Sequence, residues 1–127
     1  MKGGTALGRV LGLGSAKQGA HHWWLQRVSS VALVPLSIWF VLSLASLPLG
    51  DFASVSAWIA ASWHAVLLCL FVLCASWHSQ QGVQVVIEDY VHGHGLKVAG
   101  LMLSNFAHVL VAATGVFAVL KVAFGTH

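Results

Sequence analysis

Charged residues are scarce in this sequence. Only 7% of its 127 residues are Asp, Glu, Lys or Arg, whereas 58% are hydrophobic and the mean hydropathy is +0.86. A soluble globular domain carries about 25% charged residues, so this composition excludes that class. The net charge of +3 comes mostly from basic residues that precede the first long apolar stretch. We therefore expect the charge to report membrane topology, with no nucleic-acid partner.

Cysteine is also rare, which excludes a disulfide framework. Cys69 and Cys74 are the only two, and both lie within one apolar stretch. Five residues apart on a helix, they point about 140° away from each other, so no bridge is expected. Both are interpreted as small apolar filler. Residues 1–19 contain glycine and charge but no apolar core, so no cleavable signal peptide is expected either.

Three stretches without Asp, Glu, Lys or Arg are long enough to cross a bilayer, which takes about 20 apolar residues per helix. They run from Val28 to Gly50, from Phe52 to about Ile87 and from Val98 to Leu120. The sequence thus predicts an all-α membrane protein with three transmembrane helices. We expect residues 1–27 to form an N-terminal arm and interfacial segment, and residues 28–127 to form the anchor domain. The positive-inside rule predicts a cytoplasmic N-terminus and a periplasmic C-terminus.

The second stretch is too long for a bilayer about 30 Å thick, because a helix rises about 1.5 Å per residue. Part of it must lie outside the hydrocarbon, either as a short interfacial piece near residues 54–58 or as an extension past Gln80. Pro48 and Gly50 predict a turn before this stretch. Pro35 predicts a kink in the first span.

His78 is the main candidate for a functional residue. It lies deep in the second stretch, where an ionisable side chain is costly unless it is coordinated or hydrogen-bonded. Gly82 follows one turn later on the same face and leaves room for a flat macrocycle. Asp89 returns to within about 20° of His78 if the helix continues. His78 is therefore interpreted as a haem ligand, with a histidine hydrogen-bonded inside the helix bundle as the alternative.

The other histidines have more ordinary interpretations. His108 lies near Asn105 in the third stretch and is the rival haem ligand, although an interhelical hydrogen bond is favoured. His64 is interpreted as an interface residue, with a ligand role as the alternative. His92 and His94 lie between the second and third spans. A solvated loop is favoured there over a metal site, because no carboxylate or thiol completes the ligand set.

The segment before the first span reads His-His-Trp-Trp-Leu-Gln-Arg over residues 21–27. Tryptophan and arginine suit the lipid headgroup layer, so one interpretation is an interfacial anchor. The other is that Arg27 and a neighbouring histidine face the helix bundle and neutralise the acidic edge of a cofactor or ligand. The two interpretations are compatible.

A longer motif begins within the second span and continues to the end of that span. It reads His-x3-Gly-x-Gln-x3-Glu-Asp-Tyr-Val and consists of His78, Gly82, Gln84, Glu88, Asp89, Tyr90 and Val91. This motif resembles that of the hydrophobic membrane anchor subunits of succinate dehydrogenase, respiratory complex II, of the smaller-anchor type. The resemblance covers nearly the whole chain, since the length, the three spans and a histidine and arginine before the first span also agree.

The resemblance implies that the chain binds haem b. His78 would be one axial ligand of the iron, and a histidine of a cytochrome b556-type anchor subunit would be the other. Arg27 would pair with a haem propionate, and Gly82 would lie against the ring. His21 occupies the family's upstream histidine position, although a shift of one residue would exchange it for His22.

The resemblance also implies a ubiquinone-reduction site and a place in a complex. Tyr90 would hydrogen-bond a carbonyl oxygen of ubiquinone, with Asp89 as its polar neighbour. The chain would dock a flavoprotein and an iron-sulfur subunit to the bacterial inner membrane, and would not itself hold the succinate site. Two alternatives stay open: an anchor of a quinol-fumarate reductase, which runs the reverse reaction, and a structural anchor without a cofactor.

Overall fold

The computed structural model describes residues 17–125, which contain four helices and no strand. The helices are α2 (Lys17–Ser46), α3 (Phe52–Ala60), α4 (Ser62–Tyr90) and α5 (His94–Phe124). Helices α2, α4 and α5 are each long and apolar enough to cross a membrane. The predicted all-α fold with three membrane helices is therefore confirmed. The expectations for the arm before residue 17 and for a signal peptide lie outside the described residues.

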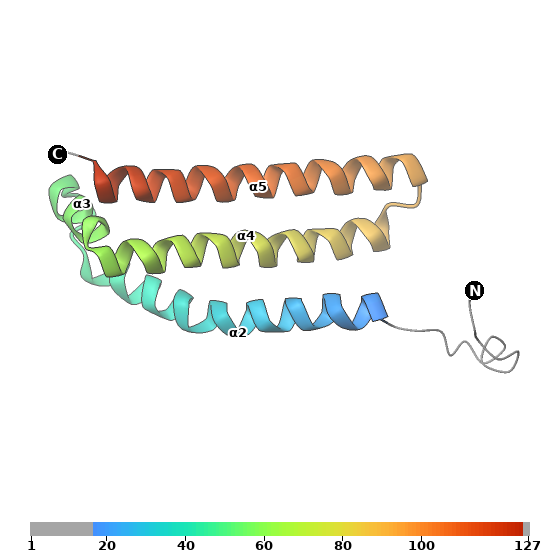
Figure 1. Cartoon of the computed structure of the whole chain (residues 1–127), viewed down its shortest axis with the longest axis horizontal. Helices are drawn as coiled ribbons and strands as arrows, with labels where there is room; N and C mark the ends of the chain where they lie inside the picture. Colours follow the sequence, from blue (N-terminus) through green and yellow to red (C-terminus); the bar gives the residue numbers. More distant parts are fainter. Residues whose placement is uncertain (1–16, 126–127) are drawn as a thin grey trace, which may run out of the picture.

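The three long helices lie side by side and antiparallel, with α4 in the middle (Figure 1). Helix α4 contacts both α2 and α5, whereas α2 and α5 do not contact each other. Both broad faces of this layer are open, and among the described residues only two apolar side chains, Ala65 and Leu68, are buried. The chain thus has no closed core of its own, and lipid or other subunits must cover its faces.

The long second apolar stretch is divided between two helices, which matches the expected short piece and the expected extension in their positions along the chain. Helix α3 is the short piece near residues 54–58, and α4 continues past Gln80 to Tyr90. The Asp51 carboxylate begins α3 by accepting hydrogen bonds from the hydroxyl of Ser54 and from its backbone N–H, the latter at 3.1 Å. These two hydrogen bonds hold the pKa of the Asp51 carboxyl below its usual value, and the bond from the hydroxyl has the larger effect.

Helix α2 begins well before the predicted first span, at Lys17, so the His-His-Trp-Trp segment is itself helical. Pro35 lies inside α2 without ending it, and the helix curves on its way to Ser46 (Figure 1). The expected turn follows, where the backbone N–H of Asp51 donates to the carbonyl of Pro48 at 2.9 Å.

Helices α4 and α5 approach closely at a glycine. A Cβ added to Gly115 would lie only 2.8 Å from Cγ1 of Val72, so a side chain there would have to displace the valine. Small residues allow such close approach between membrane helices. Cys69 and Cys74 on α4 are free thiols, as the sequence predicted.

Candidate functional site

His78 lies near the middle of α4 and is half-buried. Its Nδ1 atom is 3.0 Å from Oγ of Ser29 on α2. Ser29 is 8% exposed, and its Oγ also lies 2.9 Å from the backbone carbonyl oxygen of Gln26. The imidazole is therefore fixed against the neighbouring helix at one of its two nitrogens.

The two contacts of Ser29 assign the tautomer of His78. A hydroxyl carries one proton and a carbonyl oxygen can only accept, so both contacts are hydrogen bonds only when the Ser29 proton goes to Gln26. The Ser29 oxygen then accepts from the Nδ1–H group of His78. The opposite tautomer would lose one of these two bonds, at about 0.5–1.5 kcal/mol. In the tautomer that makes both bonds, the neutral ring carries its lone pair on Nε2, which makes no hydrogen bond with another described residue.

His108 on α5 differs, because both of its ring nitrogens are used. Nδ1 is 2.8 Å from the backbone carbonyl oxygen of Ser104, to which it donates. Nε2 is 3.1 Å from Oγ of Ser79 on α4 and accepts the proton of that hydroxyl. The interhelical hydrogen bond favoured for His108 is thus confirmed. Its partner on α4 was not foreseen.

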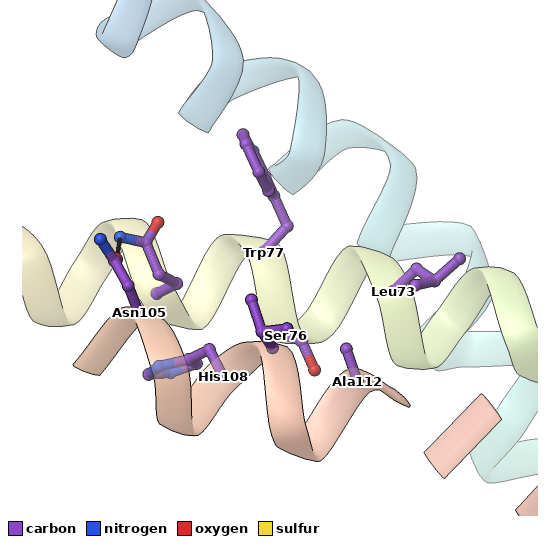
Figure 2. Close-up of a pocket in the computed structure, with 8 residues that line it drawn as sticks. Leu73, Ser76, Trp77, Asn105, His108 and Ala112 are labelled. Atoms are coloured by element: carbon purple, nitrogen blue, oxygen red, sulfur yellow. Dashed lines mark hydrogen bonds between the residues drawn. The ribbon is translucent and has the colours of Figure 1, made fainter. Parts of the chain in front are cut away.

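His108 also lines a groove of about 450 Å³ between α4 and α5. The groove is lined by Leu73, Ser76, Trp77, Gln80, Asn105, His108, Val109 and Ala112 (Figure 2). Gln80 Nε2 donates to Oδ1 of Asn105 at 2.6 Å, the bond dashed in Figure 2, and to Oε1 of Gln84 at 3.3 Å. Gln84 Nε2 donates in turn to Glu88 at 2.8 Å. These polar side chains largely bond one another.

Just beyond His78, α4 combines open space with a buried polar atom. A Cβ added to Gly82 would meet no atom within 4 Å, so the space predicted beside the histidine is present. Gln81 is 2% exposed, and its Oε1 atom has no hydrogen-bond partner among the described residues. A buried acceptor without a partner costs about 1–3 kcal/mol. The space at Gly82 is open to a bound group, whereas the Gln81 oxygen is enclosed by the chain itself.

The basic residues of α2 are not gathered around the central histidine. Residues two apart on a helix point about 160° away from each other, so Arg27 faces away from the contact that Ser29 makes. Arg27 is exposed, and its guanidinium carbon lies 5.3 Å from the centroid of the Trp23 ring. His21 is exposed and lies about 12 Å along the axis from Ser29. The side chain of His22 lies outside what the structure describes.

Asp89 and Tyr90 form the last turn of α4, about 16–18 Å along the helix from His78. Both are exposed, Tyr90 by 77%, and neither side chain bonds another described residue. The end of α4 is capped separately, because Nζ of Lys97 donates to the backbone carbonyl of Glu88 at 2.7 Å. The carboxylate and the phenol thus remain available to a ligand at this end of the layer.

The remaining histidines lie at helix ends. Nδ1 of His92 is 3.1 Å from the backbone carbonyl oxygen of Tyr90, and His94 is the exposed first residue of α5. Nδ1 of His64 donates to the carbonyl of Trp58 at 2.8 Å, and the two rings stack 4.5 Å apart. A position three residues into α4 agrees with the interpretation of His64 as an interface residue.

Sequence reasoning missed two features of this site. Ser29 was not among the candidate residues, because nothing in the sequence places it opposite His78, 49 residues away. The series of hydrogen bonds from Gln80 through Gln84 to Glu88 could have been predicted, because residues four apart share one face of a helix.

Comparison with known proteins identifies the family. Residues 1–120 match the family described as the succinate dehydrogenase/fumarate reductase transmembrane subunit. The succinate dehydrogenase hydrophobic membrane anchor subunit of Rickettsia conorii is 35% identical over 85 residues, 66% of this chain and 68% of its own length. The subunit of the same name from Paracoccus denitrificans is 31% identical over 114 residues, 90% of this chain and 88% of its own. No solved structure matches. The chain therefore belongs to the family of transmembrane subunits of succinate dehydrogenase and fumarate reductase.

Proposed function

We propose that this chain is the membrane anchor of a succinate:ubiquinone oxidoreductase, in which His78 holds one side of a haem b and Tyr90 and Asp89 form part of the ubiquinone-reduction site. Its family makes it a multi-pass membrane subunit of the succinate dehydrogenase complex. The proposed partners are a cytochrome b556-type anchor subunit, an iron-sulfur subunit and a flavoprotein. The proposed location is a bacterial inner membrane with the N-terminus in the cytoplasm.

The contrast between the two central histidines carries the proposal. His108 uses both ring nitrogens in hydrogen bonds within the chain, whereas His78 keeps the lone pair of Nε2 for a ligand from outside. A metal-binding histidine usually donates its other N–H to an oxygen, as Nδ1–H of His78 does to Ser29. The open space at Gly82 also suits a flat ring lying beside this histidine.

A haem shared between two chains agrees with the ligands that this chain offers. His108, the other histidine in the middle of a long helix, uses both ring nitrogens in hydrogen bonds within the chain. An iron bound by His78 would therefore take its other protein ligand from another subunit. When bound, haem supplies one-electron storage, while the protein supplies position and charge.

Arg27 and His21 are proposed to balance the charge of the haem propionates. Arg27 is exposed and forms no ion pair within residues 17–125, so its charge is available. A guanidinium can bind a carboxylate through two parallel hydrogen bonds. To do so here, Arg27 would leave the Trp23 ring over which it lies.

Tyr90 and Asp89 suit a quinone site because they lie at a helix end with free polar atoms. The phenol of Tyr90 can donate a hydrogen bond to a quinone carbonyl oxygen. Reduction of a quinone consumes two protons, and the carboxylate of Asp89 is placed where water can resupply them.

The test is a reduced-minus-oxidised spectrum of the purified complex with matched histidine variants. We expect His78→Ala to abolish or shift the haem α-band. The chain should still insert into the membrane, which is checked by the amount of this subunit in the purified complex. His108→Ala should keep the band, because that histidine bonds only within the chain. Loss of the band in His108→Ala alone would move the ligand to α5. A complex without any Soret band would instead support a structural anchor.

A further inference from the structure

We propose that Ser29 is the positioning residue of His78: its hydroxyl fixes the tautomer and orientation of the imidazole and so tunes the iron that Nε2 would bind. The inference rests on the proposed role of His78 as a haem ligand. It adds a residue from the first span, which the motif on α4 does not contain.

The position of Ser29 singles it out on α2. It is the buried member of a run in which Arg27 and Val28 are exposed and Ser30 is half-buried. Its contact with His78 is the only hydrogen bond between α2 and α4 among the described residues. This bond therefore holds the ring against α2, beside the stacking of Phe40 on Phe71 that also joins the two helices.

The bonds form a series that runs from the ring into the backbone. Nδ1–H of His78 donates to Oγ of Ser29, which donates to the carbonyl of Gln26. Bonds in such a series strengthen one another, and a donor bond at Nδ1 makes the opposite nitrogen a more basic ligand. A more basic ligand favours ferric over ferrous iron. Removal of the Ser29 oxygen should therefore raise the reduction potential of the haem.

Ser30 provides a matched control for the substitution. Its Oγ donates to the same carbonyl of Gln26, at 2.8 Å, but it does not contact His78. Ser29→Ala and Ser30→Ala each remove one hydroxyl bond to the backbone of the same turn. Only Ser29→Ala also removes the partner of the imidazole.

The experiment is a redox titration of the haem α-band in the assembled complex. Loss of an outer hydrogen-bond partner typically weakens a metal site about 10- to 100-fold. If the ferric form is weakened tenfold more than the ferrous form, the potential rises by about 59 mV for one electron. We expect that rise in Ser29→Ala, recovery in Ser29→Thr, which keeps the hydroxyl, and no change in Ser30→Ala.

The outcomes separate this inference from the role of His78. An unchanged potential in Ser29→Ala would overturn the inference while leaving the ligand assignment intact. Equal shifts in the Ser29→Ala and Ser30→Ala variants would also overturn it. A haem α-band that is unchanged in His78→Ala would instead remove the proposed function. If Ser29→Ala does not assemble, Ser29→Cys replaces it, because a thiol has a similar volume but is a weaker acceptor. An unchanged reduction potential in Ser29→Cys would also overturn the inference.

Discussion

Substitution of Gly115 by alanine should destabilise the contact between α4 and α5. The added Cβ would lie 2.8 Å from Cγ1 of Val72, closer than two carbon atoms can pack. Val72 cannot turn away easily, because a β-branched side chain has one strongly preferred rotamer in a helix. The helices must then separate, and overpacking of this kind costs about 1–3 kcal/mol.

Gly100→Ala is the matched control, because it places the same methyl group in the same pair of helices. There the Cβ would lie 3.5 Å from Ile87, which is ordinary contact. Both changes replace a glycine inside α5, so the gain in helix propensity cancels in the comparison. The free energy of unfolding of the purified complex should therefore be lower in Gly115→Ala than in Gly100→Ala by about 1–3 kcal/mol.

A second substitution tests the cause of that difference. Val72→Ala removes the methyl group that Gly115→Ala would strike, so the clash is absent from the double variant. The double variant should therefore lose less stability than the sum of the losses in the two single variants. This coupling is measured by denaturant unfolding of the unaltered protein, the two single variants and the double variant. A fluorescence pair on α4 and α5 reports the loss of contact between the helices. Equal stabilities of Gly115→Ala and Gly100→Ala, or strictly additive effects, would refute the reasoning.

Two further predictions concern polar residues at the groove and at the end of α4. Asn105→Ala should weaken the contact between α4 and α5 by about 0.6 kcal/mol in unfolding measurements, because Asn105 accepts from Gln80 across the helices. Thr114→Ala should leave that contact unchanged, since Thr114 bonds only carbonyls of its own helix. Tyr90→Phe should reduce ubiquinone reductase activity far more than electron transfer from succinate to a soluble dye, and equal losses would argue against a quinone role for Tyr90.

Much of the fold follows from the order of residues alone. Charge-free stretches of sufficient length predict the three membrane helices, and the excess length of the second predicts its division. The point of division was not predictable. Helix α3 ends at Ala60, and the backbone of the next residue, Ala61, is extended although no proline or glycine lies nearby. Helix α3 contacts α4 and α5, and tertiary contacts of this kind override local propensity without leaving a signal in the sequence.

The sequence names candidate residues for the site but does not predict their arrangement. The family motif picked out His78 from α4, while the partner of its Nδ1 comes from α2. The position of α2 along its axis relative to α4 determines which of its serines contacts the ring. A difference of one residue in sequence rotates a side chain by about 100° around the helix. Arg27 illustrates the same limit, since it lies close to Ser29 in sequence but faces away from its contact with His78.

The open layer of helices gives His78 a physical explanation. In a closed bundle, a polar nitrogen in an apolar interior would be paired within the chain, because unpaired polar atoms there are costly. Here Nε2 of His78 makes no hydrogen bond with another described residue, on the middle helix of a layer that is open on both faces. Gln81 differs, because its Oε1 atom is enclosed by the chain and is not accessible to a group outside it. The family comprises transmembrane subunits, and a layer whose faces must be covered by lipid or other subunits agrees with that membership.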